Sequence, residues 1–392
     1  MATIQIDGTP DDDVLTNDGT NRSDDISGYA IFGLDGNDIL EGSHGDDILN
    51  GGVGVLDAVS YFNEIDSVSV DLMAGTATGA GIGNDSLIDI EVVDAGKGDD
   101  VLYGDDRYNI LRGWEGNDTI ISGNGNGDIL AGRGSTLYGG KGHDVLDSSN
   151  VLDATIGIVM YGNEGADSLT GGKGNDVLFG GFGNDTLDGG AGGLDDIASY
   201  RLETASVKVD LVKGISIGKD SGTDTLFNIE SVNGTNFKDT LIGNDQNNVL
   251  QSFKGRDTLI GGAGDDTLIG GVGNDKIQTG VGNDNIMLDS LTGVDRISDF
   301  SVKNDTIQLA QINQEFQSSA FDSLALGELA SDMFISGEGL TTANDSNDYL
   351  IYNKTTGALY YDADGSGDVN TPVQIAVIGN QAALTSADFI VI

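Results

Sequence analysis

The chain has 392 residues, and its 64 acidic and 18 basic side chains give a formal net charge of −46. Nucleic acids and anionic membrane surfaces are themselves negative, so this charge argues against both as partners. Cysteine is absent, which excludes disulfides and thiolate metal sites, and no apolar stretch is long enough to predict a membrane-spanning helix.

Glycine numbers 62 and proline only two, a mixture that favours regularly repeated tight turns over a proline-rich disordered linker. The N-terminal segment "MATIQIDGTPDDDVL" has no basic region followed by an apolar core, so we do not expect a secretory signal peptide there.

A nine-residue unit recurs along most of the chain, and "GGKGNDVLFGGFGNDTLDGG" at residues 171–190 contains it twice. We number it G1-G2-x3-G4-x5-D6-x7-U8-x9, where U is a large aliphatic residue. Position 6 falls on Asp38, Asp47, Asp100, Asn109, Asp118, Asp144, Asp167, Asp176, Asp185, Asp239, Asn248, Asp257, Asp266, Asp275 and Asp284. Position 8 is Leu or Ile in every one of these units, whereas position 7 is mixed.

This pattern predicts a turn of about six residues followed by a short strand with one buried side chain. Glycine permits the positive φ angles and close backbone approach that such a turn needs. One unit cannot bury its own aliphatic residue, but stacked units can. If two units complete one coil, residues i and i+18 lie above each other, the leucines form a narrow core, and the turns stack along two edges.

Stacked aspartates on those edges would repel each other, and a divalent cation between successive turns would remove the repulsion. Ca²⁺ accepts about six to eight oxygens from carboxylates and carbonyls in loose geometry. Zn²⁺ prefers His and Cys, and Mg²⁺ requires a tighter octahedron. The alternative, a solvated glycine-rich surface without metal, leaves the regular position 8 unexplained.

The repeat resembles the RTX (haemolysin-type) calcium-binding nonapeptide. The resemblance implies an all-β fold, a parallel β-roll that binds multiple Ca²⁺ through its position-6 aspartates. The stacked pairs would be Asp167 with Asp185, Asp257 with Asp275, Asp266 with Asp284, Asp239 with Asp257, and Asp100 with Asp118. Asn109 and Asn248 bring no charge, so sites at these positions are expected to be weaker.

A longer repeat relates "LDAVSYFNEIDSVSVDLMAGTATG" from Leu56 to "DDIASYRLETASVKVDLVKGISIG" from Asp195. Asp57 recurs as Asp196 at an offset of 139 residues, and the same offset continues into the nonapeptides. The duplicated modules span residues 57–123 and 196–262. Their alternating strands predict spacers that continue the coil or, alternatively, a ligand-binding face.

We therefore expect N-terminal RTX-like repeats at 1–56, a spacer with repeats at 57–130, repeats at 131–195, a second spacer with repeats at 196–297, and a small C-terminal β domain at 298–392.

The C-terminal sequences "GALYYDADGSG" and "LTSADFIVI" resemble the end of RTX proteins that are exported by the type I route. That resemblance implies an uncleaved C-terminal signal, a bacterial ABC exporter as partner, and a secreted, extracellular or cell-surface location. A plain end of a β domain is the alternative. Asp362, Asp364 and Asp368 could converge on a further Ca²⁺, although an Asp-Gly hairpin turn explains this stretch equally well.

Catalytic signatures are missing from the sequence, so we do not expect an enzyme. His44 and His143 occupy turn positions, and neither H-E-x-x-H, G-x-S-x-G nor a Walker A motif occurs. Trp114 and Phe253 occupy corresponding places in the two modules. They either cover the end of a coil or stack against a carbohydrate.

We expect a secreted calcium-binding repeat protein that folds on Ca²⁺ outside the cell and serves a structural, self-assembling, surface-associated or adhesive role. The alternatives are a module that binds a polysaccharide or a receptor, a toxin-like effector, and an unrecognised enzyme. The lack of a long apolar segment argues against pore formation.

Overall fold

The computed structural model describes residues 4–16, 28–124, 133–193, 195–313, 318–365 and 371–392. These residues form β-strands and two short 3-10 helices, η1 (Ser331–Met333) and η2 (Ser386–Asp388), without an α-helix. None of their helices could cross a bilayer. The chain divides into two compact units. Unit 1 comprises Met1–Ala198 with Ser221–Ile229, and unit 2 comprises Ser199–Asp220 with Glu230–Ile392.

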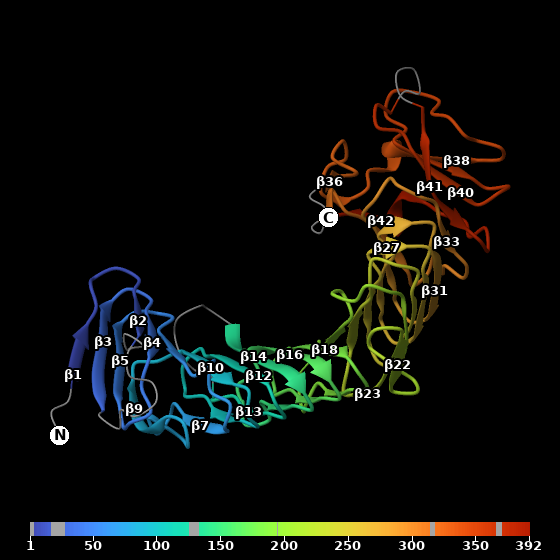
Figure 1. Cartoon of the computed structure of the whole chain (residues 1–392). Coiled ribbons are helices and arrows are strands. Elements are labelled where there is room, and N and C mark those ends of the chain that lie inside the picture. The colour runs from blue at the N-terminus through green and yellow to red at the C-terminus, as the bar shows by residue number, and fades with distance from the viewer. Residues whose placement is uncertain (1–3, 17–27, 125–132, 194, 314–317, 366–370) are drawn as a thin grey trace. The chain divides into compact units, whose positions relative to one another are not determined.

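Unit 1 is a roll of two sheets, to which the coils contribute strands alternately (Figure 1). In pairing order, its sheet A contains β1 (Ile4–Asp7), β3 (Tyr29–Asp35), β5 (Ile48–Val53), β9 (Gly83–Ile88), β8 (Thr76–Gly79), β7 (Val68–Asp71), β11 (Val101–Tyr103), β13 (Thr119–Ile121), β15 (Val145–Asp147), β17 (Ser168–Thr170), β19 (Thr186–Asp188) and β23 (Thr223–Phe227). Sheet B contains β2 (Val14–Thr16), β4 (Ile39–Glu41), β6 (Ala58–Ser60), β10 (Val92–Gly96), β12 (Ile110–Glu115), β14 (Arg133–Gly142), β16 (Gly157–Gly165), β18 (Val177–Phe182) and β20 (Ile197–Ser199).

Unit 2 shows the same arrangement, with further strands in sheets A and B. Its sheet A contains β22 (Ile215–Gly218), β21 (Val207–Asp210), β25 (Thr240–Ile242), β28 (Thr258–Ala263), β31 (Lys276–Val281), β33 (Asp295–Ile297), β41 (Val373–Ile378), β40 (Ala358–Tyr361), β39 (Leu350–Asn353) and β38 (Phe334–Gly337). Sheet B contains β24 (Ser231–Asn233), β26 (Val249–Gln251), β29 (Thr267–Ile269), β32 (Asn285–Leu288), β34 (Thr306–Leu309), β42 (Phe389–Val391) and β37 (Gly327–Glu328). Two minor pairs are β27 (Lys254–Gly255) with β30 (Val272–Gly273) and β35 (Ile312–Asn313) with β36 (Ser318–Ser319).

The predicted parallel β-roll is therefore confirmed, and its register follows the sequence period. Strands β26 and β29 align Leu250 with Leu268, eighteen residues apart. Where residues are inserted between units, the turns absorb them and the aliphatic positions still align, as in the pairing of Leu111 with Leu137. The register is therefore held by the buried aliphatic side chains rather than by a constant loop length.

The spacer of the first module continues sheet A as an antiparallel meander, β7–β8–β9. Its two outer strands pair in parallel with the neighbouring coils, β9 with β5 and β7 with β11. In unit 2, β21 likewise pairs antiparallel with β22 and parallel with β25. The spacers are thus structural continuations of the roll.

The C-terminal strands form antiparallel hairpins, β39–β40–β41, and they also extend the roll. Strand β41 pairs with β33 in sheet A, and β42 pairs with β34 in sheet B. This segment therefore covers the last coil and belongs to the same compact unit as the preceding repeats.

The core lies between the two sheets, and the position-8 side chains form its repeating part. All fifteen of these Leu and Ile residues are at most 1% exposed. Complete burial of such a side chain stabilises the fold by about 1.5–3 kcal/mol. The regular aliphatic position is therefore what holds the two sheets together.

Truncation of one core position provides a first prediction. Leu259 is fully buried, and its neighbour Ile260 is only partly buried on the outer face. Leu259→Ala is expected to lower the free energy of unfolding in saturating calcium by about 2–5 kcal/mol, because it leaves a cavity. Ile260→Ala is the matched control and should cost clearly less. Urea denaturation measures both, and equal losses would contradict the assigned register.

Candidate metal centre

The position-6 side chains lie at the beginning of the strands, along the two edges of each roll. The thirteen predicted nonapeptide aspartates are all at most 3% exposed. Aspartate is rarely so buried unless it is paired or binds a metal. The partners of both carboxylate oxygens therefore decide what these residues do.

One oxygen of each carboxylate accepts a backbone N–H from a neighbouring coil. These hydrogen bonds form a ladder along the roll, and we call each accepting side chain a rung. The backbone N–H of Asp239 donates to Oδ1 of Asp257 at 2.7 Å, and the N–H of Asp257 donates to Oδ1 of Asp275 at 2.8 Å. The other predicted stacks have the same contact, at 2.8 Å for the Asp100–Asp118 pair, 2.9 Å for Asp167–Asp185 and 3.0 Å for Asp266–Asp284. The structure therefore brings together all five predicted pairs.

The second oxygen divides the aspartates into two groups. In Asp47, Asp176 and Asp239 it accepts a local backbone N–H, for example that of Gly172 at 2.7 Å from Oδ2 of Asp176. In the other ten, Oδ2 is buried and has no hydrogen-bond partner among the described residues; they are Asp38, Asp100, Asp118, Asp144, Asp167, Asp185, Asp257, Asp266, Asp275 and Asp284. A buried carboxylate oxygen without a partner is costly, so these ten need an additional positive or donor group.

The glycine at position 1 keeps space open beside these oxygens. A Cβ atom at Gly162 would lie less than 3.0 Å from both Oδ2 of Asp167 and the carbonyl oxygen of Gly180 in the next coil. At Gly261 the same holds for Oδ2 of Asp266 and the carbonyl oxygen of Thr279. A carboxylate and a carbonyl thus face one space that only glycine leaves free.

This donor set fits Ca²⁺, which takes oxygen ligands from both carboxylates and carbonyls. The described residues contain no group of three or more His, Cys, Asp or Glu side chains that could hold a metal. A site here would therefore combine few carboxylates with backbone carbonyls, which disfavours zinc.

Comparison with known families identifies these units. The family model described as "RTX calcium-binding nonapeptide repeat (4 copies)" matches residues 30–55, 94–129, 132–150, 161–193, 233–268 and 252–286. The chain carries RTX repeats. No curated protein matches the sequence.

Among solved structures, the chain is similar to the extracellular lipase LipA from Serratia marcescens, at 15% sequence identity and a TM-score of 0.24. The similarity covers 72% of this chain and 44% of the lipase chain, so this chain spans less than half of the length of that protein.

Burial raises the pKa of the RTX aspartates, because a carboxylate loses its hydration inside the roll. Desolvation, reinforced by the charges of Asp144 and Asp100, raises the pKa of Asp118 to about 8. Desolvation also raises the pKa of Asp167 to about 7 and that of Asp144 to about 6. The metal-free roll is therefore strained electrostatically at neutral pH.

Asn248 shows how an uncharged rung is satisfied without a cation. Its amide Nδ2 donates to the carbonyl oxygen of Glu230 at 2.9 Å, and its Oδ1 accepts the N–H of Asn244 at 2.7 Å. Asn109 similarly donates from Nδ2 to Oδ1 of Asp105 at 3.1 Å. The predicted weakness of calcium sites at these two positions remains a prediction.

Some rungs of the ladder were missed because they fall outside the nine-residue phase. Asp57 accepts the N–H of Asp38 at 2.8 Å, and Asp85 accepts that of Asp47 at 2.9 Å. The duplication offers a signal, since these two aspartates recur 139 residues later. Among the described residues, the acidic rungs outside the phase are Asp57, Asp85, Glu91, Asp196, Asp224, Asp295 and Asp305.

Position 5 forms a second, more exposed ladder that the sequence analysis did not anticipate. The side chain of Asn117 accepts the N–H of His143 at 2.8 Å, and Nδ1 of His143 accepts the N–H of Ala166 at 2.8 Å. The histidine therefore acts as an acceptor between coils, in the same way as the neighbouring Asn117.

The proposed C-terminal cluster is only partly described. Asp362 is fully buried, and its Oδ1 accepts the N–H of Asp364 at 3.3 Å. Asp368 lies outside the described residues. The visible contact is that of a local turn, and the metal role of these three residues remains a prediction.

Proposed function

We propose that this chain is an exported calcium-dependent β-roll that folds outside the cell and serves a structural or adhesive role at the surface. The proposal rests chiefly on the ten buried aspartate oxygens that lack a hydrogen-bond partner. Proteins with RTX repeats are typically secreted, which supports an extracellular location. The type I exporter, read through a signal in residues 298–392, is part of this proposal.

Several Ca²⁺ ions are proposed to bind, at the carboxylates whose second oxygen has no partner. Oδ1 of each carboxylate already accepts the N–H of a neighbouring coil. We therefore assign Oδ2 as the calcium ligand, together with carbonyl oxygens of the glycine-rich turns. Asp47, Asp176 and Asp239 are weaker candidates, because a backbone N–H already satisfies their second oxygen. A bound Ca²⁺ supplies the positive charge that these desolvated carboxylates need.

Coupled folding and binding explains how such a chain could be exported. Extracellular calcium modules typically bind with dissociation constants of about 10⁻⁴–10⁻³ M, well above cytosolic calcium. Inside the cell the net charge of −46 and the raised aspartate pKa values disfavour the compact state. Outside, calcium binds only the folded coils and shifts the equilibrium toward them.

A catalytic role is not part of the proposal. His143 is an acceptor in a turn ladder rather than a member of a nucleophile–base pair. A polysaccharide-binding role is the second candidate function, because one face of unit 1 carries partly exposed aromatic side chains beside a pocket.

Far-ultraviolet circular dichroism of EDTA-stripped protein, titrated with CaCl₂, tests the proposal. We expect a cooperative gain of β-structure with Ca²⁺ and little change with MgCl₂, the matched control cation. A full β-spectrum in EDTA would show that the aliphatic core suffices alone, and it would overturn calcium-dependent folding.

A further inference from the structure

Sheet B of unit 1 presents a continuous row of side chains that align in register on adjacent strands, Asp94, Arg112, Tyr138, Tyr161 and Phe179. We call this the aromatic row. The rings of Tyr138 and Tyr161 stack with centroids 4.7 Å apart and planes at 5°. The rings of Tyr161 and Phe179 stack at 4.6 Å and 11°. The row therefore ends in a flat, half-buried aromatic surface.

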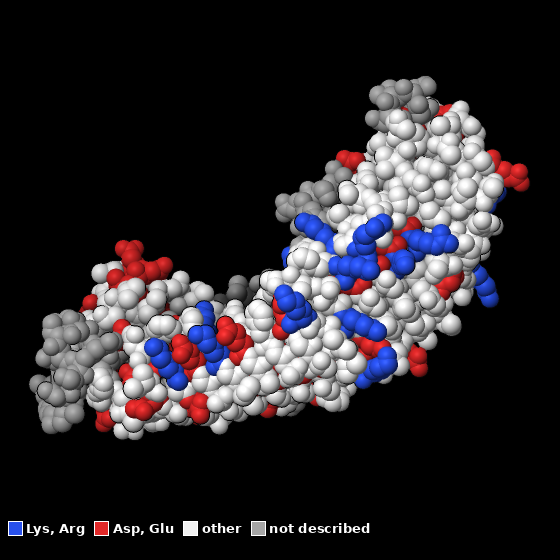
Figure 2. Space-filling view, turned by 45° about the vertical axis from the view of Figure 1, so that its right-hand side comes forward, with Lys and Arg blue, Asp and Glu red and all other residues white. Residues whose placement is uncertain are grey.

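At the charged end of the row, formed by Asp94 and Arg112, the acidic and basic charges are paired with each other. Nη1 of Arg112 lies 3.0 Å from Oδ1 of Asp94, and the guanidinium lies 5.7 Å from the centre of the Tyr138 ring. At the ends of the same two strands, β12 and β14, Nζ of Lys141 lies 3.8 Å from a carboxylate oxygen of Glu115. Basic and acidic side chains are interleaved on the surface rather than gathered into one sign (Figure 2). Such a surface favours an uncharged ligand.

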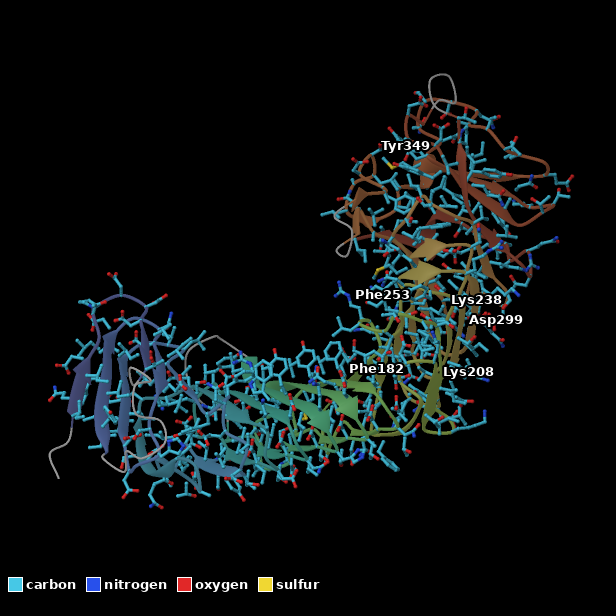
Figure 3. The ribbon with its side chains drawn as sticks, viewed as in Figure 1. Phe182, Lys208, Lys238, Phe253, Asp299 and Tyr349 are labelled. Carbon is cyan, nitrogen blue, oxygen red and sulfur yellow. The ribbon has the colours of Figure 1, made fainter. Side chains whose placement is uncertain are left out.

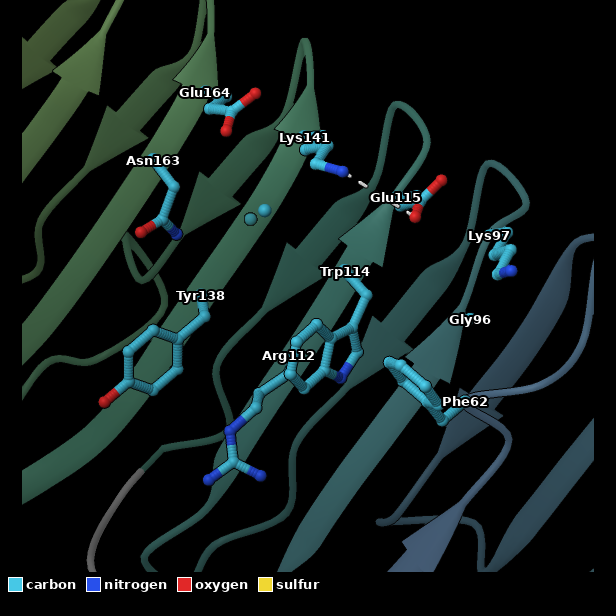
Figure 4. A pocket seen from close by; sticks show the side chains of 12 residues that line it. Phe62, Gly96, Lys97, Arg112, Trp114, Glu115, Tyr138, Lys141, Asn163 and Glu164 are labelled. Atoms are coloured by element: carbon cyan, nitrogen blue, oxygen red, sulfur yellow. Dashed lines mark ion pairs between the residues drawn. The ribbon is translucent and has the colours of Figure 1, made fainter.

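A pocket of about 610 Å³ opens at this end of the row (Figure 4). Phe62, Trp114 and Tyr138 supply its apolar surface, whereas charged and amide side chains and glycine backbone supply the rest. None of the described residues that line it has an aliphatic side chain. Aromatic faces combined with many hydrogen-bonding groups are typical of sites for small polar ligands.

Trp114 lies in this pocket at some cost to the fold. It has a φ of 79°, and its register neighbours on adjacent strands are Gly96 and Gly140. A non-glycine residue in this region costs about 1–3 kcal/mol. Non-glycine residues in other units have a positive φ at this repeat position as well, so the strain alone does not mark a site. Trp114 differs from its counterpart Phe253 in exposure, 42% against 4%.

The ring of Trp114 is also held in place. Its Nε1–H donates to Oδ1 of Asp94 at 3.0 Å, and the ring of Phe62 meets it edge-on at 4.9 Å and 76°. A fixed, exposed ring loses little conformational freedom when a ligand stacks on it. Exposure, a fixed ring and a place in the pocket together indicate a binding role rather than the covering of a coil end.

We propose that this face of unit 1 binds a neutral polysaccharide, with sugar rings stacked on Trp114 and the aromatic row and sugar hydroxyls on the flanking Lys, Glu and Asn side chains. This inference deepens the proposed surface role and rests on the calcium-folded roll. The row spans four strand spacings, or about 19 Å, so several sugar units would lie along it.

Other occupants fit less well. Strands β12, β14 and β16 are each paired on both sides, so a peptide cannot be added as a further strand. An apolar helix or a lipid chain would favour aliphatic lining, and the part of the lining that the structure describes has none. The net charge of −46 disfavours nucleic acid.

The test uses the full chain in saturating calcium on an array of neutral β-linked glucan and mannan oligosaccharides, with polygalacturonate oligosaccharides as the acidic set. The best binder is then measured by titration calorimetry. Trp114→Gly is expected to weaken binding at least tenfold while leaving the calcium midpoint of folding unchanged, because glycine suits its φ. Tyr161→Ser, which removes one ring of the stack, should also weaken binding.

Phe237→Ala is the matched control, because this aromatic residue is 45% exposed on unit 2 and outside the pocket. The control should bind like the unaltered chain. Binding to the acidic set alone, no binding at all, or equal effects of the three substitutions would overturn the proposal. Calcium-independent folding with intact glycan binding would refute only the folding proposal, so the two failures can be told apart.

Discussion

Replacing Asp257, Asp266 and Asp275 together by Asn is expected to raise the calcium concentration needed for folding and, at the same time, to stabilise the calcium-free roll. All three carboxylates accept a ladder N–H through Oδ1 and leave Oδ2 without a partner. An Asn side chain keeps the acceptor and removes the charge. Calcium then loses ligands, and the metal-free state loses a source of electrostatic strain.

The natural rung at Asn248 supports this expectation, since its Nδ2 donates to a backbone carbonyl of the preceding coil. At about tenfold excess over its dissociation constant, each calcium ion stabilises the folded state by about 1.4 kcal/mol. Weakening several sites should therefore shift the folding midpoint to clearly higher calcium. Circular dichroism titrations from EDTA to saturating CaCl₂ measure both effects on the same samples.

Two comparisons make the result specific. The corresponding triple Ala variant loses the ladder acceptor as well, so it should need more calcium and should also be less folded in EDTA. Asp239→Asn, at a rung whose two oxygens already accept the N–H groups of Val207 and Thr235, should change the midpoint least. If the Asn and Ala triple variants behaved alike in EDTA, the ladder contact would not contribute to the fold.

The periodic part of the fold could be predicted from the sequence, because each coil must bury an aliphatic side chain and so repeats the same pattern. Position 8 must reach the core in every coil, so Leu and Ile recur at a fixed phase, and Asp recurs at position 6 where each strand begins. Asp57 and Asp85 carry the same ladder contacts but follow turns of different length. A fixed period cannot find them, because the register of the strands, and not the spacing in sequence, defines their place.

The aromatic row was beyond sequence reasoning for the same reason. Tyr138 and Tyr161 are twenty-three residues apart in the sequence, and an insertion before Leu137 separates that strand from the previous coil. Only the pairing of β14 with β16 shows that their rings stack. Phe182, at the end of β18, lies on the same sheet and is equally hidden in the sequence pattern (Figure 3). The sequence singled out Trp114 by its place in the repeat, but only the structure shows its positive φ and its hydrogen bond to Asp94.

Lowering the pH in EDTA is expected to fold the calcium-free chain. Burial raises the pKa of Asp118 to about 8 and that of Asp167 and Asp257 to about 7, from an ordinary value of 3.8. The folded state therefore binds more protons than the unfolded state between these values. The resulting stabilisation is complete below about pH 4, and it is lost as the pH rises through about 6 to 8.

Circular dichroism in EDTA should thus show β-structure increasing as the pH falls from 8 toward 5. In CaCl₂ the expected effect of pH is the opposite. Protons and calcium compete for the same oxygens, so the calcium affinity falls and the calcium midpoint rises as the pH falls. The triple Asn variant separates this effect from the general reduction of the −46 charge, since it retains most acidic residues but lacks three of the titrating rungs. Its folding in EDTA should depend less on pH than that of the unaltered chain. A calcium-free signal that stays constant from pH 8 to 5 would mean that the buried carboxylates do not oppose folding, and the need for calcium would then have to arise elsewhere in the turns.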